Sequence, residues 1–235
     1  MDFFELADKR RSVRKFTDEP VPEEVINKSL QASLLAANSS NLQPWEFYWV
    51  RSLEKKNNLV EACFSQSAAR TAQELIVAVS RIDTWRRNRD FILAEYEKKE
   101  SYPQIVKKYY NKIVPLAYAH DRVGILGFMK KLLSLLLSFI GIFKPIPRGP
   151  VFRSDVFEIV TKTTALACQN FMMALVSQGY DSCPMEGFDH KRVKKILKLN
   201  NKSHVVMVLG VGKADPKGIY GERFRIDEDL VIKII

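Results

Sequence analysis

A short basic segment near the N-terminus has the residue types that a phosphate site needs. The seven residues from Arg10 to Phe16 include four bases and one hydroxyl. Guanidinium forks match phosphate oxygens in shape and charge. In an extended chain Arg10, Ser12 and Arg14 share one face, because side chains alternate between the two sides of the backbone. Taken alone, the segment is more often a solvated basic turn than a binding site.

A second candidate is the polar loop from Ala37 to Trp45, whose residues are almost all small, polar or turn-forming. Ser, Asn and Gln side chains offer both donors and acceptors, which suits the edge of a flat heteroaromatic ring with C=O and N–H groups. Polar loops between ordered elements are where a scaffold presents binding groups. The same composition fits a connecting loop that binds nothing, and this segment alone leaves both interpretations open.

Two later segments complete the set of candidates. Pro184 and Gly187 lie in the stretch from Tyr180 to Asp189, where small residues let the backbone approach a ligand closely. Near the C-terminus, Arg223 and Arg225 stand two residues apart. These two bases either form one more exposed turn or add charge to an anion site.

These four segments, in this order, resemble the motifs of the FMN-dependent nitroreductase family. The first resembles the family's Arg-x-Ser-x-Arg/Lys-x-Phe motif, and the loop resembles Pro-Ser-Ser-x-Asn-x-Gln-Pro-Trp. The third resembles Pro-x-Glu-Gly-Phe, and the last resembles the family's paired C-terminal bases. The loop departs from the family at Ala37, Asn38 and Ser39, which replace Pro-Ser-Ser. The resemblance covers roughly residues 3–80 and 155–226.

The resemblance implies an FMN site. In such a site Arg10 and Ser12 hold the phosphate, Arg14 lies near the N1–C2=O edge of the flavin, and Arg223 and Arg225 close the phosphate site. Gln66 lies near the flavin pyrimidine, and the backbone of Glu186 and Gly187 bonds the ring around N5 and O4. The other residues that it assigns to the cofactor are Asn38, Ser39, Asn41, Gln43, Pro184 and Met185, of which Asn38 and Ser39 serve the partner subunit's flavin.

The resemblance also implies a reaction. NADH or NADPH delivers hydride to flavin N5 and leaves, and a nitroaromatic, quinone or similar small acceptor then takes the reducing equivalents in a ping-pong cycle. The cofactor performs the organic chemistry while the protein binds, orients and tunes it. Arg14 would stabilise negative charge that develops on the ring. No side chain is expected to act as a catalytic acid or base.

The elements that must position these residues alternate between helix and strand. Apolar periodicity predicts strands at 46–50, 74–80 and 205–212, and helices at 25–36, 53–64 and 189–199. A long apolar helix is expected from Val156 to Gln178, N-capped by Asp155 and closed by Gly179. We therefore predict a single α+β domain over residues 1–235 with a nitroreductase-like fold. Its small mixed or antiparallel sheet is flanked by helices, and a swapped C-terminal arm joins two copies in a homodimer.

Residues 84–150 are predicted to be a variable helical insertion. Eleven of the sixteen residues from Phe128 to Phe143 are apolar, and Lys130, Ser134, Ser138 and Gly141 form one narrow polar stripe on a helical wheel. Sixteen helical residues reach about 24 Å, short of the roughly 30 Å hydrocarbon core of a membrane. We expect a buried helix or a lid on the substrate pocket first, and contact with a membrane surface through Lys130, Lys131, Lys144 and Arg148 second.

Net charge and cysteine spacing restrict the other functions that the sequence allows. A formal net charge of +10 favours anionic partners, but no nucleic-acid motif accompanies it, so nucleic acid is disfavoured. The cysteines, Cys63, Cys168 and Cys183, form no paired motif, which argues against zinc and for a reducing cytoplasm. The alternatives left open are a non-redox flavin binder, a flavin-processing relative, an iodotyrosine-deiodinase-like enzyme and a basic module that binds a membrane surface or nucleic acid.

Overall fold

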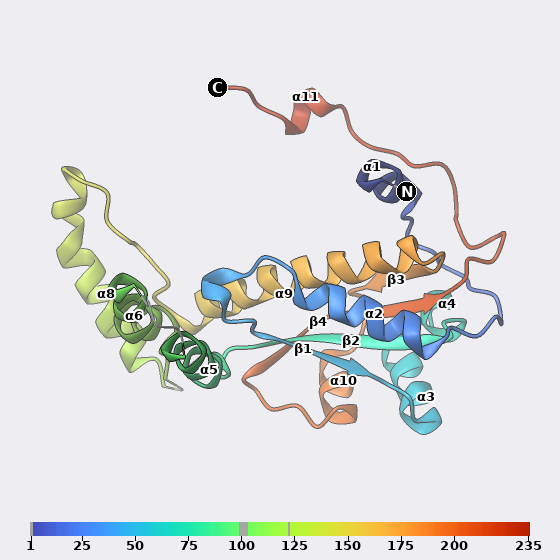
Figure 1. Cartoon of the computed structure of the whole chain (residues 1–235), viewed down its shortest axis with the longest axis horizontal. Coiled ribbons are helices and arrows are strands. Elements are labelled where there is room, and N and C mark those ends of the chain that lie inside the picture. The colour runs from blue at the N-terminus through green and yellow to red at the C-terminus, as the bar shows by residue number, and fades with distance from the viewer. Residues whose placement is uncertain (1, 99–102, 122) are drawn as a thin grey trace.

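The computed structural model describes residues 2–98, 103–121 and 123–235. The chain folds around a four-stranded sheet with strand order β1-β2-β4-β3 (Figure 1). All three neighbouring pairs are antiparallel, so of the two predicted kinds of sheet the antiparallel one forms. The strands are β1 (Trp45–Trp49), β2 (Glu74–Arg81), β3 (Asp181–Met185) and β4 (Ser203–Gly212).

Helices cover both faces of this sheet. Helices α2 (Glu23–Leu34) and α9 (Arg153–Ser177) lie on one face, and α3 (Leu53–Ala62) and α10 (His190–Ile196) lie on the other (Figure 1). Successive side chains of β2 point to opposite faces of the sheet, so β2 packs against both helix layers. Ile76 packs with the α2 and α9 residues, and the adjoining Val77 packs with the α3 and α10 residues. The predicted α+β architecture is confirmed.

Helix α9 is the central helix of the domain. Within the described parts of the chain, it is the one helix long and apolar enough to cross a membrane, yet half of its most apolar window is buried inside the protein. It begins earlier than predicted, with Phe152 as its N-cap. Asp155 therefore lies in the first turn, and its carboxylate accepts hydrogen bonds from the N–H groups of Val151 and Phe152 at 2.8 and 3.0 Å. The prediction of Asp155 as N-cap was wrong, because the capping carboxylate reaches back from inside the helix.

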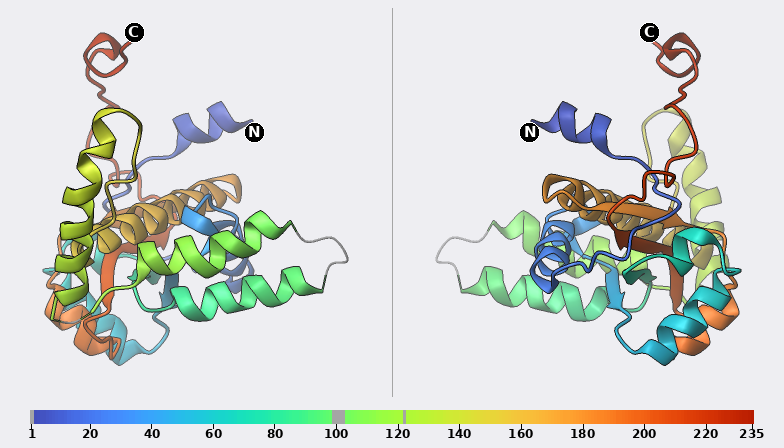
Figure 2. Two further views of the ribbon diagram at one scale, coloured as in Figure 1. Left: turned by 90° about the vertical axis from the view of Figure 1, so that its left-hand side faces the viewer. Right: turned by 90° about the vertical axis from the view of Figure 1, so that its right-hand side faces the viewer.

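The remaining helices gather at the two ends of α9. At one end, Trp85, Tyr110, Val114 and Tyr118 bury themselves against Val156. At the other end α1 lies above the sheet layer (Figures 1 and 2). The bounds are α1 (Phe3–Lys9), η1 (Ser39–Asn41), α4 (Ser67–Arg70), α5 (Trp85–Glu97), α6 (Gln104–Lys108), the π-helical turn η2 (Tyr109–Ile113), α7 (Val114–Tyr118), α8 (Ile125–Ser138), η3 (Ile140–Ile142) and α11 (Glu228–Val231).

Two predicted segments differ from their expected structure. No strand was predicted before Glu186, yet the chain from Asp181 to Met185 pairs with β4 and forms β3. The apolar segment at 128–143 is not a buried helix. Gly127 is the buried residue of α8, whereas Phe128 and Phe139 are 68% and 75% exposed. The C-terminal residues form one helical turn, α11, in an exposed tail that extends away from the sheet (Figure 2).

Candidate functional site

The basic N-terminal segment is extended and lies beside β3. Ser12 forms a parallel bridge with Ser182, and the N–H of Val13 donates to the Ser182 carbonyl at 3.0 Å. Val13 is fully buried while its two neighbours are only partly so. This alternation places Ser12 and Arg14 on the side opposite Val13, as the sequence predicted.

Five predicted residues line one cavity of about 400 Å³, namely Arg10, Ser12, Arg14, Arg223 and Arg225. The segment from Ile219 to Arg225 forms its other wall. Arg223 is fixed in place by the N-terminal segment, because its guanidinium donates to the carbonyls of Ala7 and Arg10 at 3.1 and 2.7 Å. The C-terminal bases and the N-terminal bases therefore face the same space, although more than two hundred residues separate them in the sequence.

The electrostatics of this cavity favour an anion. Partial burial lowers the pKa of Arg10, and the positive charges of Arg223, Arg225 and Arg11 lower it further. Like charges held together raise the free energy of the cluster, and an anion between them reverses that cost through charge-assisted hydrogen bonds. The lining holds five arginines against one carboxylate, Glu222, and adds the Ser12 hydroxyl, so its net positive donor set fits a phosphate monoester.

A second group of predicted residues surrounds the end of β3. The Nη1 of Arg14 donates to Sγ of Cys183 at 3.3 Å, and the Nε2 of Gln66 donates to the Gly187 carbonyl at 3.0 Å. The ladder between β3 and β4 ends at Met185. The peptide groups of Glu186 and Gly187 thus lie beyond the sheet, and a Cβ added to Gly187 would have no atom within 4 Å. This open, polar edge of backbone can receive a flat ligand.

Helix α4 supports the same edge. A Cβ on Gly210 of β4 would lie 2.8 Å from the Ala68 carbonyl, so only glycine lets α4 rest directly on the sheet. Gln66 is the N-cap of α4, and Arg70 follows it by four residues.

The polar loop has a different set of partners. The Asn38 Oδ1 accepts from the N–H of Gln43 at 2.9 Å, and the Gln43 Nε2 donates to the Asn41 carbonyl at 3.3 Å. The Tyr118 hydroxyl donates to Oγ of Ser39 at 2.8 Å. Asn41 and Gln43 have left-handed backbone conformations, with φ of 50° and 45°. The loop is thus a defined structure that packs on η2 and α7.

Within one protomer this loop lies far from the cavity lined by Arg10, Ser12, Arg14, Arg223 and Arg225, which we call the basic cavity. The loop follows α2 at the end of the molecule where α5 and α7 lie, whereas α4 and the chain after α1 lie at the opposite end (Figure 1). The structure therefore brings together Arg10, Ser12, Arg14, Gln66, Pro184, Met185, Glu186, Gly187, Arg223 and Arg225, and it leaves Asn38, Ser39, Asn41 and Gln43 apart from them.

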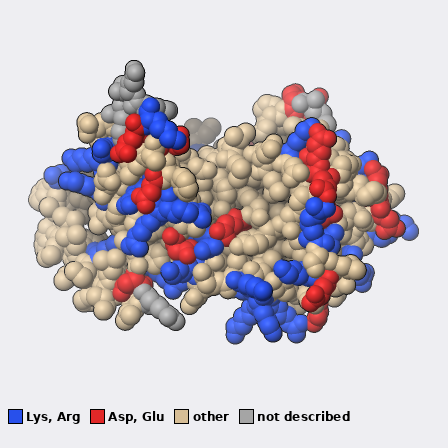
Figure 3. All heavy atoms as spheres, turned by 60° about the horizontal axis from the view of Figure 1, so that its bottom comes forward, with Lys and Arg blue, Asp and Glu red and all other residues tan. Residues whose placement is uncertain are grey.

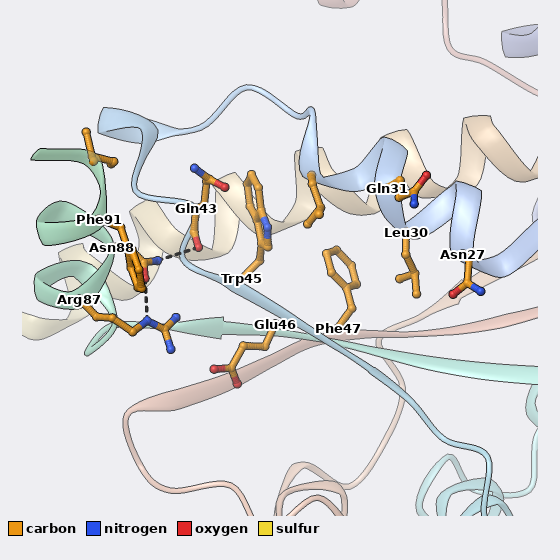
Figure 4. Close-up of a pocket in the computed structure, with 12 residues that line it drawn as sticks. Asn27, Leu30, Gln31, Gln43, Trp45, Glu46, Phe47, Arg87, Asn88 and Phe91 are labelled. Carbon is orange, nitrogen blue, oxygen red and sulfur yellow. Dashed lines mark hydrogen bonds between the residues drawn. The ribbon is translucent and has the colours of Figure 1, made fainter. Parts of the chain in front are cut away.

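A larger cavity of about 1020 Å³ lies beside the loop, between α2, β1 and α5 (Figure 4). Its lining includes Gln43, Trp45 and Phe47 from the chain after α2. The Nδ2 of Asn88 donates to the Leu42 carbonyl at 2.7 Å, which fixes the loop against α5. This wall mixes aromatic and amide groups, as small-molecule sites do, and periodicity gave no signal for the role of Asn88.

The three cysteines are free and buried. Burial raises the pKa of Cys63 and Cys168 to about 12, so their thiols stay protonated at neutral pH. Among residues 2–98, 103–121 and 123–235, no cluster of three or more His, Cys, Asp or Glu side chains is arranged to hold a metal ion.

Comparison with known proteins gives this arrangement its context. The sequence model of the nitroreductase family matches residues 7–107 and 155–213. The chain belongs to the nitroreductase family. The matched ranges contain the whole sheet and omit residues 108–154, where α8 and η3 lie. They also end before Arg223 and Arg225. In the folded protein Arg223 bonds the Arg10 carbonyl, so this unmatched segment lies against the matched N-terminal one.

Relatives and solved structures extend over nearly the whole chain of this nitroreductase-family enzyme. It is 27% identical over 214 residues to Protein DrgA of Synechocystis, covering 91% of this chain and 84% of that protein. It is 24% identical over 230 residues to the NADH dehydrogenase of Thermus thermophilus, covering 97% and 94%. A nitroreductase family protein from Streptococcus pneumoniae shares the fold with a TM-score of 0.72 at 22% identity, with full coverage of both chains. A protein from Exiguobacterium sibiricum, solved in complex with FMN, has a TM-score of 0.72 at 22% identity and coverage of 100% and 98%.

Proposed function

We propose that this protein is an FMN-dependent oxidoreductase that uses NADH or NADPH to reduce a nitroaromatic, quinone or similar small acceptor in a two-electron ping-pong cycle. The observation that carries the proposal is the basic cavity, in which Arg10, Ser12 and Arg14 face Arg223 and Arg225. The FMN in the related Exiguobacterium sibiricum structure supports the same cofactor.

The basic cavity would hold the FMN phosphate. Arg10 and Ser12 approach it from the N-terminal segment, and Arg223 and Arg225 approach it from the C-terminal segment. FMN held there would supply two-electron chemistry between the nicotinamide and the acceptor. Arg14 is held by Cys183 near the end of β3, where its charge would stabilise negative charge on the ring.

The isoalloxazine would lie along the open edge after β3. Pro184 and Met185 would pack against its face, and the peptide groups of Glu186 and Gly187 would bond its edge. Gln66 already bonds the Gly187 carbonyl at 3.0 Å and so fixes the distance between α4 and this edge.

A second copy of the chain would complete the site. Asn38, Ser39, Asn41 and Gln43 lie at the far end of the protomer from the basic cavity, so they would meet the flavin of the partner. Large apolar side chains near the two termini are exposed, among them Phe3 at 67%, Phe4 at 81% and Phe224 at 79%. A homodimer with exchanged C-terminal arms would cover them, since apolar surface of this extent rarely stays in water.

Because the three cysteines are free and buried, we assign the enzyme to a reducing compartment such as the cytoplasm. A non-redox flavin binder would share the same cofactor contacts. Steady-state oxidation of NADH and NADPH, with and without a nitroaromatic or a soluble quinone, separates the two. We expect acceptor-dependent oxidation that Arg10→Ala reduces and that Arg148→Ala, outside the cavity, leaves unchanged. A flavin-loaded protein without acceptor-dependent turnover would contradict the oxidoreductase and leave the flavin site intact.

A further inference from the structure

Helix α8 turns its polar stripe toward the protein. The Lys130 Nζ donates to the Ala119 carbonyl at 2.7 Å, at the C-terminal end of α7. Burial there lowers the pKa of Lys130. Gly127 is buried, and a Cβ on it would lie 3.0 Å from the Phe152 ring. A Cβ on Gly141 would lie 3.1 Å from Ile146 of the returning chain. The inner side of this segment therefore consists of its small and polar residues.

The opposite side of the segment is apolar and faces solvent. At about 100° per residue, the exposed side chains cover roughly half of the helix circumference. Leu132 is 52% exposed, Leu136 is 63% exposed and Phe143, at the tip, is 88% exposed. This placement reverses the usual arrangement, in which the apolar stripe faces the core. We call this surface the α8 apolar face; its members are Ile125, Phe128, Met129, Leu132, Leu133, Leu135, Leu136, Phe139, Ile140, Ile142 and Phe143.

The segment that carries this face has charges of one sign. Residues 123–154 contain five bases and no acid. On the side of the molecule shown in Figure 3, by contrast, Lys and Arg stand beside Asp and Glu over much of the surface. Lys131 is an exposed base on α8 itself, and the exposed Lys144 and Arg148 follow its tip. Exposed bases that accompany a wide apolar face suit a surface that is apolar inside and anionic outside.

We propose that α8 and η3 dock the protein on the interface of a bilayer that contains anionic lipids. Fourteen residues of helix reach only about 21 Å, so α8 would lie along the interface rather than span the roughly 30 Å core. The apolar face carries no polar side chain that could set a register against another protein, whereas protein interfaces surround their core with a polar rim. Asp121 caps the first turn of α8, but the segment itself carries only bases. This basic charge complements lipid phosphates, and the complementarity favours a membrane over a second copy of the chain.

Vesicle flotation with the full-length protein tests the proposal. We expect binding to phosphatidylcholine vesicles that contain about 30% phosphatidylglycerol, weak binding to phosphatidylcholine alone, and release at high salt. Leu132→Gln/Leu136→Gln should lower the partition coefficient at least about tenfold, because each leucine loses its apolar burial. Leu53→Gln, which alters a 73% exposed leucine on α3, is the matched control and should bind like the wild type.

Three results would overturn the proposal. The first is no binding to either kind of vesicle. The second is binding that the Leu132→Gln/Leu136→Gln double substitution leaves unchanged. The third is an oligomer that light scattering detects without lipid and that the Leu132→Gln/Leu136→Gln double substitution dissociates. In that case a second copy of the chain would cover the face. Circular dichroism and flavin content of each variant verify the fold. Vesicle binding needs no redox turnover, so its failure and the failure of the proposed enzymatic function are distinguishable.

Discussion

Helices α8 and α9 are both strongly apolar, yet the protein uses them in opposite ways. Helix α9 has 25 residues and lies between the sheet, α2 and the α5–α7 helices, which bury ten of them. Helix α8 has 14 residues, and of these Gly127 is the buried one. Length and composition together mark α9 as the candidate membrane helix, whereas the structure places α9 in the core and exposes α8. Apolar content therefore shows that a helix needs a partner, and only the neighbouring elements show whether that partner is inside the domain.

The largest expected effect is on the free energy of unfolding, and it distinguishes α9 from α8. Phe171 of α9 is fully buried, so Phe171→Ala should lower the free energy of unfolding by about 3–5 kcal/mol. Leu136→Ala on α8 removes a side chain that is already 63% exposed and should change it by less than about 0.5 kcal/mol. Urea unfolding in lipid-free buffer measures both. Equal losses would show that α8 packs in the core after all.

The next effect concerns the basic cavity. Arg10→Ala or Arg225→Ala removes one charge-assisted contact to the FMN phosphate, worth about 1.5–3 kcal/mol. FMN should therefore bind about tenfold to a hundredfold more weakly, as measured by fluorescence titration of the apoprotein. Arg148→Ala, which removes a base close to α8, should leave FMN affinity unchanged. If all three arginines behaved alike, general charge rather than the cavity would attract FMN.

A smaller effect is expected for the polar loop. Ser39→Ala should lower FMN affinity by about 1 kcal/mol, since it removes one hydrogen-bonding group from the proposed partner site. Tyr118→Phe removes the same Tyr118–Ser39 hydrogen bond without touching that site and is the control. Coexpressing Ser39→Ala with Arg10→Ala should yield mixed dimers that hold one intact site. Mixed dimers whose FMN titration shows no site of wild-type affinity would contradict the shared site.

The smallest effect belongs to the junction between α8 and α9. Backbone hydrogen bonds from Phe152 and Val151 lower the pKa of Asp155. A lowered folded-state pKa stabilises the fold above the ordinary aspartate pKa of about 3.9, and this stability is lost as pH falls through the folded pKa. Asp155→Asn should therefore flatten the stability–pH curve below about pH 4, by about 0.5–1 kcal/mol. Urea unfolding at pH 3 to 5 measures the slope, and an unchanged slope would count against this capping role.

Much of the scaffold was predictable because its signals are local. The apolar run of β2 and the periodicity of α2 gave those elements to within a few residues, and the Arg10/Ser12/Arg14 spacing needs only an extended chain. The sequence did not show which distant segments lie near each other in the folded protein. That Arg223 bonds the Arg10 carbonyl, while Ser39 meets Tyr118 at the far end, depends on tertiary contacts across the whole chain.

The segment containing α8 shows the other limit. Its stripe of Lys130, Ser134, Ser138 and Gly141 was visible on a helical wheel, but the wheel does not say which side faces the protein. The acceptor for Lys130 is the carbonyl end of α7, which no periodicity indicates. The expectation of a buried helix followed the ordinary rule that apolar residues turn inward, whereas in α8 Lys130 and the buried Gly127 face the protein.

The most direct test of the central claim is the absorption spectrum of the purified protein under anaerobic conditions. We predict the two-band visible spectrum of bound FMN, either as purified or after reconstitution, and loss of the longer-wavelength band when NADH or NADPH is added. Addition of a nitroaromatic or a quinone should then restore the oxidised spectrum. A protein that retains no FMN after reconstitution, or whose bound FMN neither nucleotide reduces, would contradict the account.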